Sequence, residues 1–196
     1  ERTLAKVLTL VEHNMMGFAF WDEAQKREEL AHPDTRLLLR SSGSDLHAFV
    51  AYRIEHEETV KVAYVYELQV AEAARGAGWG SRLLEEVERL GREAGARGIM
   101  LTVHRKNHRA IQFYTNRQGF EISPISPSRC APPHLLRTCD YEVMQLFWEA
   151  EAEQTLLERG AAARRELYIE AMDEGKFRIR LTMSTRGAPA RRGQQR

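Results

Sequence analysis

The sequence predicts one α/β domain with a mixed, mostly antiparallel sheet and helices on both sides. Two observations support this fold class. Three runs with strand-like composition follow one another in the first half of the chain, separated by short turns. After them the apolar spacing changes to that of a helix, and a short apolar run, a second helix and two further strands complete the pattern.

The first part of the chain predicts two helices and then an antiparallel meander. Apolar residues recur at helical spacing over residues 3–16. Asp22 can cap a second, more polar helix over residues 22–31, and Pro33 prevents its continuation. The three strands that follow are expected over residues 36–40, 46–57 and 60–70.

The second part alternates helices and strands. A helix is expected from about Trp79 to Gly95, and a later one begins with Asn107 as its N-cap. A buried strand is expected over 98–103, between these two helices, and the later helix is expected to cover 107–118. A strand over 120–122, a loop rich in Ser and Pro, and a strand over 140–147 follow.

We divide the chain into a main domain (1–147), a helical extension (148–183) and a basic, disordered tail (184–196). The tail contains arginines and no acid, and a solvated, disordered segment is expected there; weak contact with nucleic acid is the alternative, and no specific nucleic-acid partner is expected. The net charge of the chain is only +1, and no apolar run approaches the roughly 20 residues that span a bilayer. We expect a monomer with no membrane contact.

The cysteines and histidines do not indicate a metal site. Cys130 and Cys139 flank a Pro-containing loop and are expected to be free thiols. His104 and His108 are four residues apart, but the change from strand to helix between them removes the shared helical face that a zinc pair needs.

The segment RGAGWG, residues 75–80, carries the strongest functional signal. It places a glycine-rich turn at the start of a helix, where unpaired backbone N–H groups and the helix dipole form an anion site. Gly78 and Gly80 let the backbone approach a phosphate without a Cβ in the way. A plain tight turn is the alternative. A P-loop is excluded because the segment lacks G-K-[ST].

The preceding strand, the R-x-x-G-x-G turn and a helix beginning N-H-x-A-x-x-F-Y together resemble the GNAT acetyltransferases. The resemblance implies a GNAT fold, acetyl-CoA as co-substrate and no metal. It assigns the pyrophosphate to the turn, the pantetheine to the end of the strand, and the lower cofactor arm and thiol side to two residues of the later helix. The turn residues for the pyrophosphate are Arg75, Gly76, Ala77, Gly78, Trp79 and Gly80. The strand residues for the pantetheine are Leu68, Gln69 and Val70, and the helix residues are Asn107 and Tyr114. A helix cap and a core aromatic are the structural alternatives for the last two.

Longer segments are similar to one GNAT subfamily, N-α-acetyltransferase 40 (NatD). They include KVLTLVEHNM, WDEAQKREEL, YVYELQV, LTVHRKNHRAIQFY, GFEISPISPS and CDYEVM. The resemblance implies acetylation of the N-terminal tails of histone H4 and histone two-A, which begin Ser-Gly-Arg-Gly, in the nucleus and cytoplasm. The subfamily usually has basic side chains within the pyrophosphate turn, whereas here Arg75 stands alone.

The resemblance also assigns the catalytic groups. Glu67 is the general base, and Tyr64 and Tyr66 line the reacting amine and order water; which tyrosine, if either, serves as the acid stays open. Independently, an α-ammonium of pKa about 7.7–8.0 must lose a proton before it attacks a thioester, and a carboxylate can take that proton. Glu67 is the acid most out of place in an otherwise apolar strand, and a solvent-facing position is the alternative.

Strict alternation puts the two tyrosines on one side of the strand and Glu67 on the other. The resemblance implies a β-bulge in this strand, which would redirect these residues toward one cavity.

The subfamily assigns peptide contacts to acidic and aromatic residues. Glu55 and Glu57, two apart on one strand, would receive the basic and N-terminal groups, with an acidic strand end as the alternative. Trp21 and Tyr141 would wall the peptide groove, or simply pack. Two other functions stay open: a GNAT enzyme for other N-termini or small amines, and a non-catalytic module that binds acetyl-CoA or chromatin.

Overall fold

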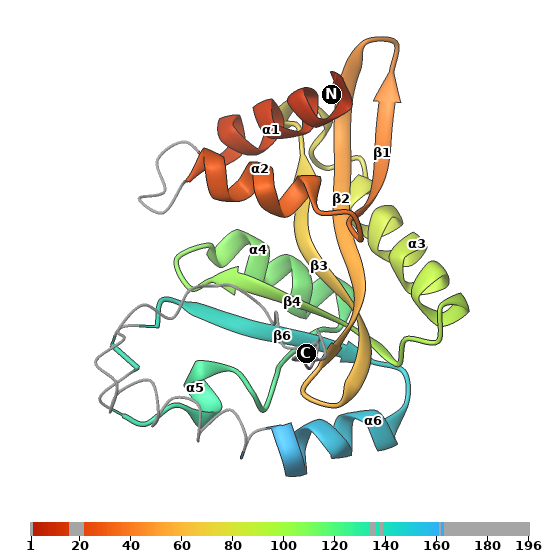
Figure 1. Ribbon diagram of the computed structural model, residues 1–196. Helices are drawn as coiled ribbons and strands as arrows, with labels where there is room; N and C mark the ends of the chain where they lie inside the picture. Colours follow the sequence, from red (N-terminus) through yellow and green to blue (C-terminus); the bar gives the residue numbers. More distant parts are fainter. Residues whose placement is uncertain (1, 16–21, 134–135, 138, 161, 163–196) are drawn as a thin grey trace, which may run out of the picture.

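The computed structural model describes residues 2–15, 22–133, 136–137, 139–160 and 162. Its helices and strands follow the predicted order (Figure 1). Along the chain they are α1 (Arg2–Met15), α2 (Glu23–Ala31), β1 (Arg36–Ser42), β2 (Asp45–Glu57), β3 (Val60–Val70), η1 (Glu72–Ala74), α3 (Trp79–Glu93), β4 (Gly98–His104), α4 (His108–Gln112), η2 (Phe113–Arg117), β5 (Glu121–Ile122), α5 (Pro127–Cys130), β6 (Tyr141–Phe147), α6 (Ala150–Thr155) and η3 (Leu156–Gly160).

The strands form one six-stranded sheet in the order β1-β2-β3-β4-β6-β5. The antiparallel meander of β1, β2 and β3 is confirmed. Strands β3 and β4 are parallel and pair only from Ala63 with Ile99 to Val65 with Leu101. Beyond Val65 the two strands diverge, as Figure 1 shows, so the second half of β3 has no partner among the described residues of β4.

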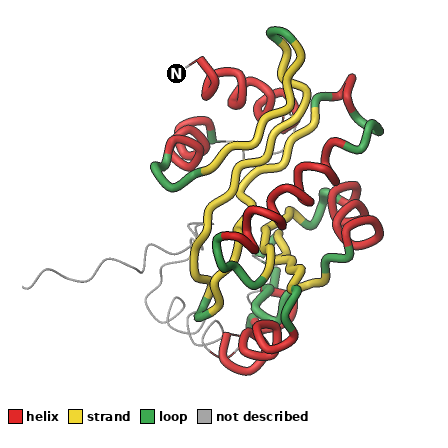
Figure 2. Tube along the Cα trace, turned by 90° about the vertical axis from the view of Figure 1, so that its right-hand side faces the viewer, coloured by secondary structure: helices red, strands yellow, loops and turns green. Residues whose placement is uncertain are grey.

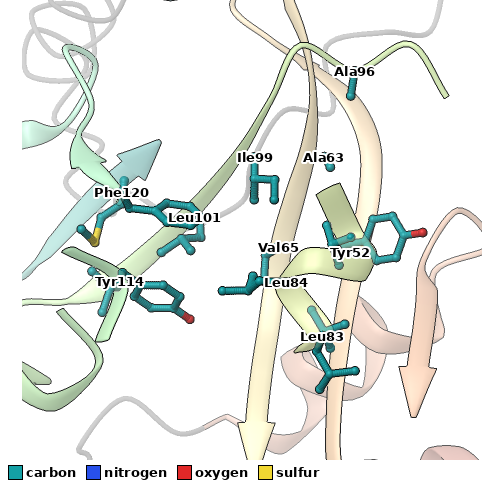
Figure 3. Packing of buried hydrophobic residues seen from close by; sticks show 14 of the residues in the cluster. Tyr52, Ala63, Val65, Leu83, Leu84, Ala96, Ile99, Leu101, Tyr114 and Phe120 are labelled. Atoms are coloured by element: carbon teal, nitrogen blue, oxygen red, sulfur yellow. The ribbon is translucent and has the colours of Figure 1, made fainter. Parts of the chain in front are cut away.

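Helices cover both faces of the sheet, and Figures 1 and 2 show α3 on the opposite side from α1 and α2. On the α3 face, the largest core cluster includes Tyr52, Val65, Leu84 and Tyr114 (Figure 3). The other face, here called the α1–α2 face, has two separate apolar clusters. One joins α1 and α2 to β2, and the other joins α5 and α6 to β3, β4 and β6.

Both predicted helix caps are present. The side chain of Asp22 accepts a hydrogen bond from the Gln25 backbone N–H (3.0 Å), and Asn107 accepts one from that of Ala110 (3.1 Å). Each bond satisfies one of the donors that a helix start leaves unpaired. The sequence signals at the starts of α2 and α4 were therefore interpreted correctly.

Two regions differ from the prediction. The helix expected over 107–118 is an α-helix only to Gln112, and a π-helical turn, η2, follows it. The Ser/Pro-rich loop contains a short helix, α5, with Pro127 at its start. Part of the helical extension also packs on the sheet, because Ala152 and Leu156 are fully buried in the cluster beneath α6.

Candidate active site

The glycine turn between η1 and α3 has open space beside two of its glycines. Gly76 and Gly78 have φ angles of +83° and +79°, and a Cβ on either would meet nothing within 4 Å. Gly78 is the N-cap of α3, and no side-chain hydrogen bond of the described residues closes this helix end. The first amides of α3 are therefore available to an anion, and the residues fit the pyrophosphate of acetyl-CoA.

The roles of Gly80 and Arg75 differ from the simple interpretation of the motif. A Cβ on Gly80 would lie 3.1 Å from the ring of Phe113, so packing between α3 and η2 also favours glycine here, and its cofactor role stays a prediction. The Arg75 guanidinium donates to the side-chain oxygen of Asn14 (2.9 Å) and to the carbonyl of Val70 (3.4 Å). Arg75 thus ties the turn to α1 and to the end of β3.

Two further arginines lie beside the turn, against the ring of Trp79. The guanidinium of Arg40, on β1, lies 4.3 Å from the ring centroid of Trp79, and that of Arg82, on α3, lies 4.8 Å from it. These cation–π contacts fix two positive charges beside the helix start. The sequence analysis did not find them because they come from different elements.

A β-bulge in β3 changes the direction of Glu67. Ala51 pairs with Glu67 and Tyr52 with Val65, so Tyr66 is the extra residue in this strand. Before the bulge Tyr64 lies on the α1–α2 face, and after it Glu67 lies on the same face, opposite Ala51. The expected bulge is confirmed, and it brings the predicted base and tyrosines to one side of the sheet.

Between the two apolar clusters of the α1–α2 face lies a set of interacting polar side chains, which we call the polar belt. It consists of Lys26 and Glu29 from α2, Arg53 and Glu55 from β2, and Tyr66, Glu67 and Gln69 from β3. The belt lies beside the point at which β3 leaves β4.

The Glu67 side chain is only 10% exposed and both of its oxygens are engaged. Oε1 lies 2.6 Å from the Lys26 ammonium, and Oε2 accepts a hydrogen bond of 2.8 Å from the Gln69 amide. Lys26 also contacts Glu29 at 2.6 Å. The carboxylate is therefore held in a fixed position by two donors from different elements.

A second group surrounds Tyr66. Its hydroxyl donates to both oxygens of Glu55, at 3.1 Å each. The Arg53 guanidinium lies 4.2 Å from the Tyr66 ring centroid, and it donates to the Thr35 hydroxyl (2.9 Å) and the Glu29 carbonyl (2.6 Å). Arg53 thus joins α2 to β2 and β3 through one planar group.

Burial shifts the pKa values of several side chains in the polar belt. It raises the pKa of Glu55, against the opposing effects of the Tyr66 hydrogen bond and the Arg53 charge. It also raises the pKa of Tyr66, with a further contribution from the Glu55 charge. For Lys26, burial alone would lower the pKa, but Glu67 and Glu29 outweigh it and the pKa rises. Lys26 is therefore an ammonium and Tyr66 a neutral phenol at neutral pH.

A family model described as the Acetyltransferase (GNAT) family matches residues 8–120. The chain belongs to this family. The predicted fold class and the predicted enzyme class, an acyltransferase, are thereby confirmed.

Relatives and solved structures agree with this assignment. N-alpha-acetyltransferase 40 of Saccharomyces cerevisiae is 40% identical over 84 residues, which is 39% of this chain and 29% of the yeast protein. An acetyltransferase from Streptococcus agalactiae (TM-score 0.59, 16% identity) covers 74% of this chain and 90% of its own, and the NatC complex bound to Gag peptide and CoA (0.55, 17%) covers 76% and 92%. PaiA N-acetyltransferase from Thermoplasma acidophilum with coenzyme A (0.53, 16%) covers 74% and 92%. At these identities the structures show a shared fold.

Other predicted cofactor contacts of this GNAT protein already have internal partners. The Val70 carbonyl accepts hydrogen bonds from Asn14 and Arg75, and the Asn107 side chain caps α4. Tyr114 is buried between Phe113 and Phe120, and burial, with a smaller effect of the Glu67 charge, raises its pKa. Their ligand roles stay predictions.

The predicted peptide contacts divide into three cases. Glu55 is on the α1–α2 face and half-buried, within the polar belt. Glu57 lies on the same face but is only 3% exposed. Tyr141 is buried in the apolar cluster beneath α5 and α6. Trp21 lies outside the described residues.

Sequence reasoning missed Lys26, Glu29 and Arg53. Arg53 is a cation in the apolar middle of β2, which is the same signal that drew attention to Glu67. Lys26 and Glu29 share one side of α2, but on a polar helix that spacing does not indicate a buried partner.

Among the described residues, no group of three His, Cys, Asp or Glu side chains is arranged to hold a metal ion. Cys130 and Cys139 are buried, and Nε2 of His104 lies 2.9 Å from Oδ2 of Asp140. None of the described helices is both long and apolar enough to cross a membrane.

Proposed function

We propose that this GNAT enzyme transfers the acetyl group of acetyl-CoA to the α-amine of a protein N-terminus, with histone H4 and histone two-A as substrates. The observation that carries the proposal is the bulge at Tyr66. It puts the carboxylate of Glu67, whose side chain is only 10% exposed, on the same face as Glu55 and next to the divergence of β3 and β4. The partial match to a named N-alpha-acetyltransferase supports the same reaction class.

The co-substrate is acetyl-CoA, which supplies an activated acyl group as a thioester. In the proposed reaction Glu67 takes a proton from the substrate ammonium, so that the nitrogen lone pair can attack the thioester carbonyl. The new C–N bond forms as the C–S bond breaks. The nitrogen loses its second proton, the sulfur gains one, and the remaining proton leaves Glu67 for solvent. Direct attack requires no nucleophile from the protein.

The polar belt also supports recognition of a basic peptide. Glu55 and Glu67 are carboxylates on one face, and Arg53 already shows that a guanidinium can be held there against an aromatic ring. In our proposal Glu55 receives the arginine at the third position of Ser-Gly-Arg-Gly, while Glu67 receives the N-terminal amine. The nuclear and cytoplasmic location that fits histone substrates belongs to the same proposal.

A peptide panel read by mass spectrometry tests the function. The expected result is one acetyl group on a Ser-Gly-Arg-Gly peptide and none on its α-blocked form. Replacing the third-position arginine with alanine should lower kcat/KM by about tenfold, the value of a partly desolvated charge pair. Acetylation of unrelated N-termini at equal rates would limit the proposal to a general N-acetyltransferase. Binding of acetyl-CoA without transfer to any amine would contradict it.

A further inference from the structure

A substrate amine that approaches Glu67 meets two existing contacts, one on each carboxylate oxygen. Oε2 is bonded to Gln69, whose side-chain oxygen accepts a hydrogen bond of 2.8 Å from Asn14. Asn14 in turn accepts the bond from Arg75. Gln69 is therefore the middle of a chain of hydrogen bonds that begins at the glycine turn, and moving it would disrupt several contacts.

The other contact, to Oε1, is easier to break. Lys26 reaches Glu67 through four flexible methylene groups, and its side chain is 20% exposed. It also has a second anion, Glu29, at the same distance of 2.6 Å. Lys26 can leave Glu67 without losing its remaining ion pair, whereas Gln69 cannot leave without a cost to Asn14 and Arg75.

We propose that the Lys26 ammonium occupies the position of the substrate's α-ammonium and competes with it for Oε1 of Glu67. This inference rests on the proposed function. When the amine arrives, Lys26 remains on Glu29 and the substrate takes its place beside Glu67. After the reaction the product nitrogen is a neutral amide, so Lys26 returns to Glu67 and favours product release. Lys26 is a positioning residue in this scheme, because it acts on the substrate through Glu67.

The proposal makes an unusual prediction about affinity. A purely structural Lys26 would stabilise α2, and its loss would weaken all peptide binding. A competitor has the opposite effect, and only on ligands that carry the charged amine. Replacing Lys26 with methionine, which is uncharged and of similar shape, should strengthen binding of a free-amine peptide and leave binding of its N-acetylated form unchanged.

The test uses calorimetric titration of the whole protein, saturated with coenzyme A, with a Ser-Gly-Arg-Gly peptide in free-amine and N-acetylated forms. We expect Lys26→Met to lower the Kd of the free-amine peptide by about threefold to fivefold, as expected for a partly exposed ion pair. Lys26→Arg keeps the cation and should restore the wild-type Kd. Lys6→Met is the matched control, because Lys6 on α1 contacts the Ser44 carbonyl and not the polar belt.

Each outcome is decisive. An unchanged or higher free-amine Kd in Lys26→Met overturns the inference, provided that the wild-type protein acetylates the peptide. If the wild type neither acetylates nor binds it, the proposed function itself has failed, and the inference fails with it. Should Lys26→Met not fold, Glu29→Gln decides the question: it removes the alternative partner of Lys26, so the free-amine Kd should rise while the acetylated Kd stays constant. A free-amine Kd that is equal in Glu29→Gln and in the wild type would overturn the inference.

Discussion

The glycine turn and the polar belt are the two halves of the candidate site, and they are built differently. The turn uses backbone amides and two glycines with positive φ, so its anion site hardly depends on side-chain identity. The belt is formed by side chains from α2, β2 and β3, and each charged group in it contacts a neighbouring polar or charged group. A backbone site is fixed by local sequence, whereas a side-chain site depends on the tertiary structure.

The largest effect should come from the belt. Glu67→Gln removes the proposed base and should lower kcat by about 10²–10⁴, since proton transfer by a positioned group contributes that much. Affinity for acetyl-CoA should not change, because the turn is untouched. Quenched time courses read by mass spectrometry measure kcat, and calorimetry measures the Kd of acetyl-CoA. Glu121→Gln, on the exposed side of β5, is the control, and a variant as active as wild type would remove Glu67 from the mechanism.

The turn should fail in the opposite way. Gly78→Ala places a Cβ at a φ of +79°, which costs roughly 1–2 kcal/mol and distorts the amides at the start of α3. We expect the Kd of acetyl-CoA to rise about tenfold. Gly43→Ala is the matched control, because Gly43 has a φ of +59° in the β1–β2 turn and also has open space around it. If Gly78→Ala and Gly43→Ala lost the same affinity for acetyl-CoA, the turn before α3 would have no specific role in cofactor binding.

A smaller effect is expected from the connection between α2 and the sheet. Arg53→Lys cannot reproduce the planar set of contacts to Thr35, Glu29 and Tyr66. It should lower the free energy of unfolding by about 1–2 kcal/mol in urea denaturation, with acetyl-CoA affinity unchanged. Arg89→Lys, in exposed ion pairs on α3, should have no measurable effect. If the two variants behave alike, Arg53 does not hold the belt together.

The smallest effect concerns alkaline pH. The folded-state pKa values of Lys26 and Tyr66 both lie above their ordinary values of 10.5 and 10.0. The unfolded chain therefore loses these protons first, so stability is full below about pH 10 and falls as pH rises further. Tyr66→Phe removes one of the two groups and should flatten this fall by less than about 1 kcal/mol, given its partial exposure. Urea denaturation at about pH 8 and about pH 11 measures how much free energy of unfolding each protein loses between the two pH values. An equal loss in Tyr66→Phe and wild type would contradict a raised pKa of Tyr66.

Most of the fold could be predicted from the sequence because its signals are local. Asp22 and Asn107 cap helices that begin where expected, and the period change after Val70 correctly separates β3 from α3. The π-helical turn at η2 was missed, since helical periodicity does not distinguish it from an α-helix. The start of α5 had a signal in Pro127, but the neighbouring Ser126 is fixed by distant contacts with Glu142 and Val143.

The candidate site was only partly predictable. RGAGWG located the turn, and Glu67 was chosen because its charge does not fit its strand. The partners of Glu67 could not be chosen in the same way. Lys26 is 41 positions away in the sequence and lies on an ordinary polar helix, so only the packing of α2 on the sheet brings the two charges together.

The bulge at Tyr66 makes the geometry of the site depend on residue number as well as residue type. Every side chain of β3 after Tyr66 has its direction set by one additional residue. Deleting that residue would send Glu67 and Gln69 to the α3 face and expose Leu68 and Val70 on the other, with every other amino acid still present. We therefore expect a single-codon deletion in this strand to impair the site more severely than most single substitutions.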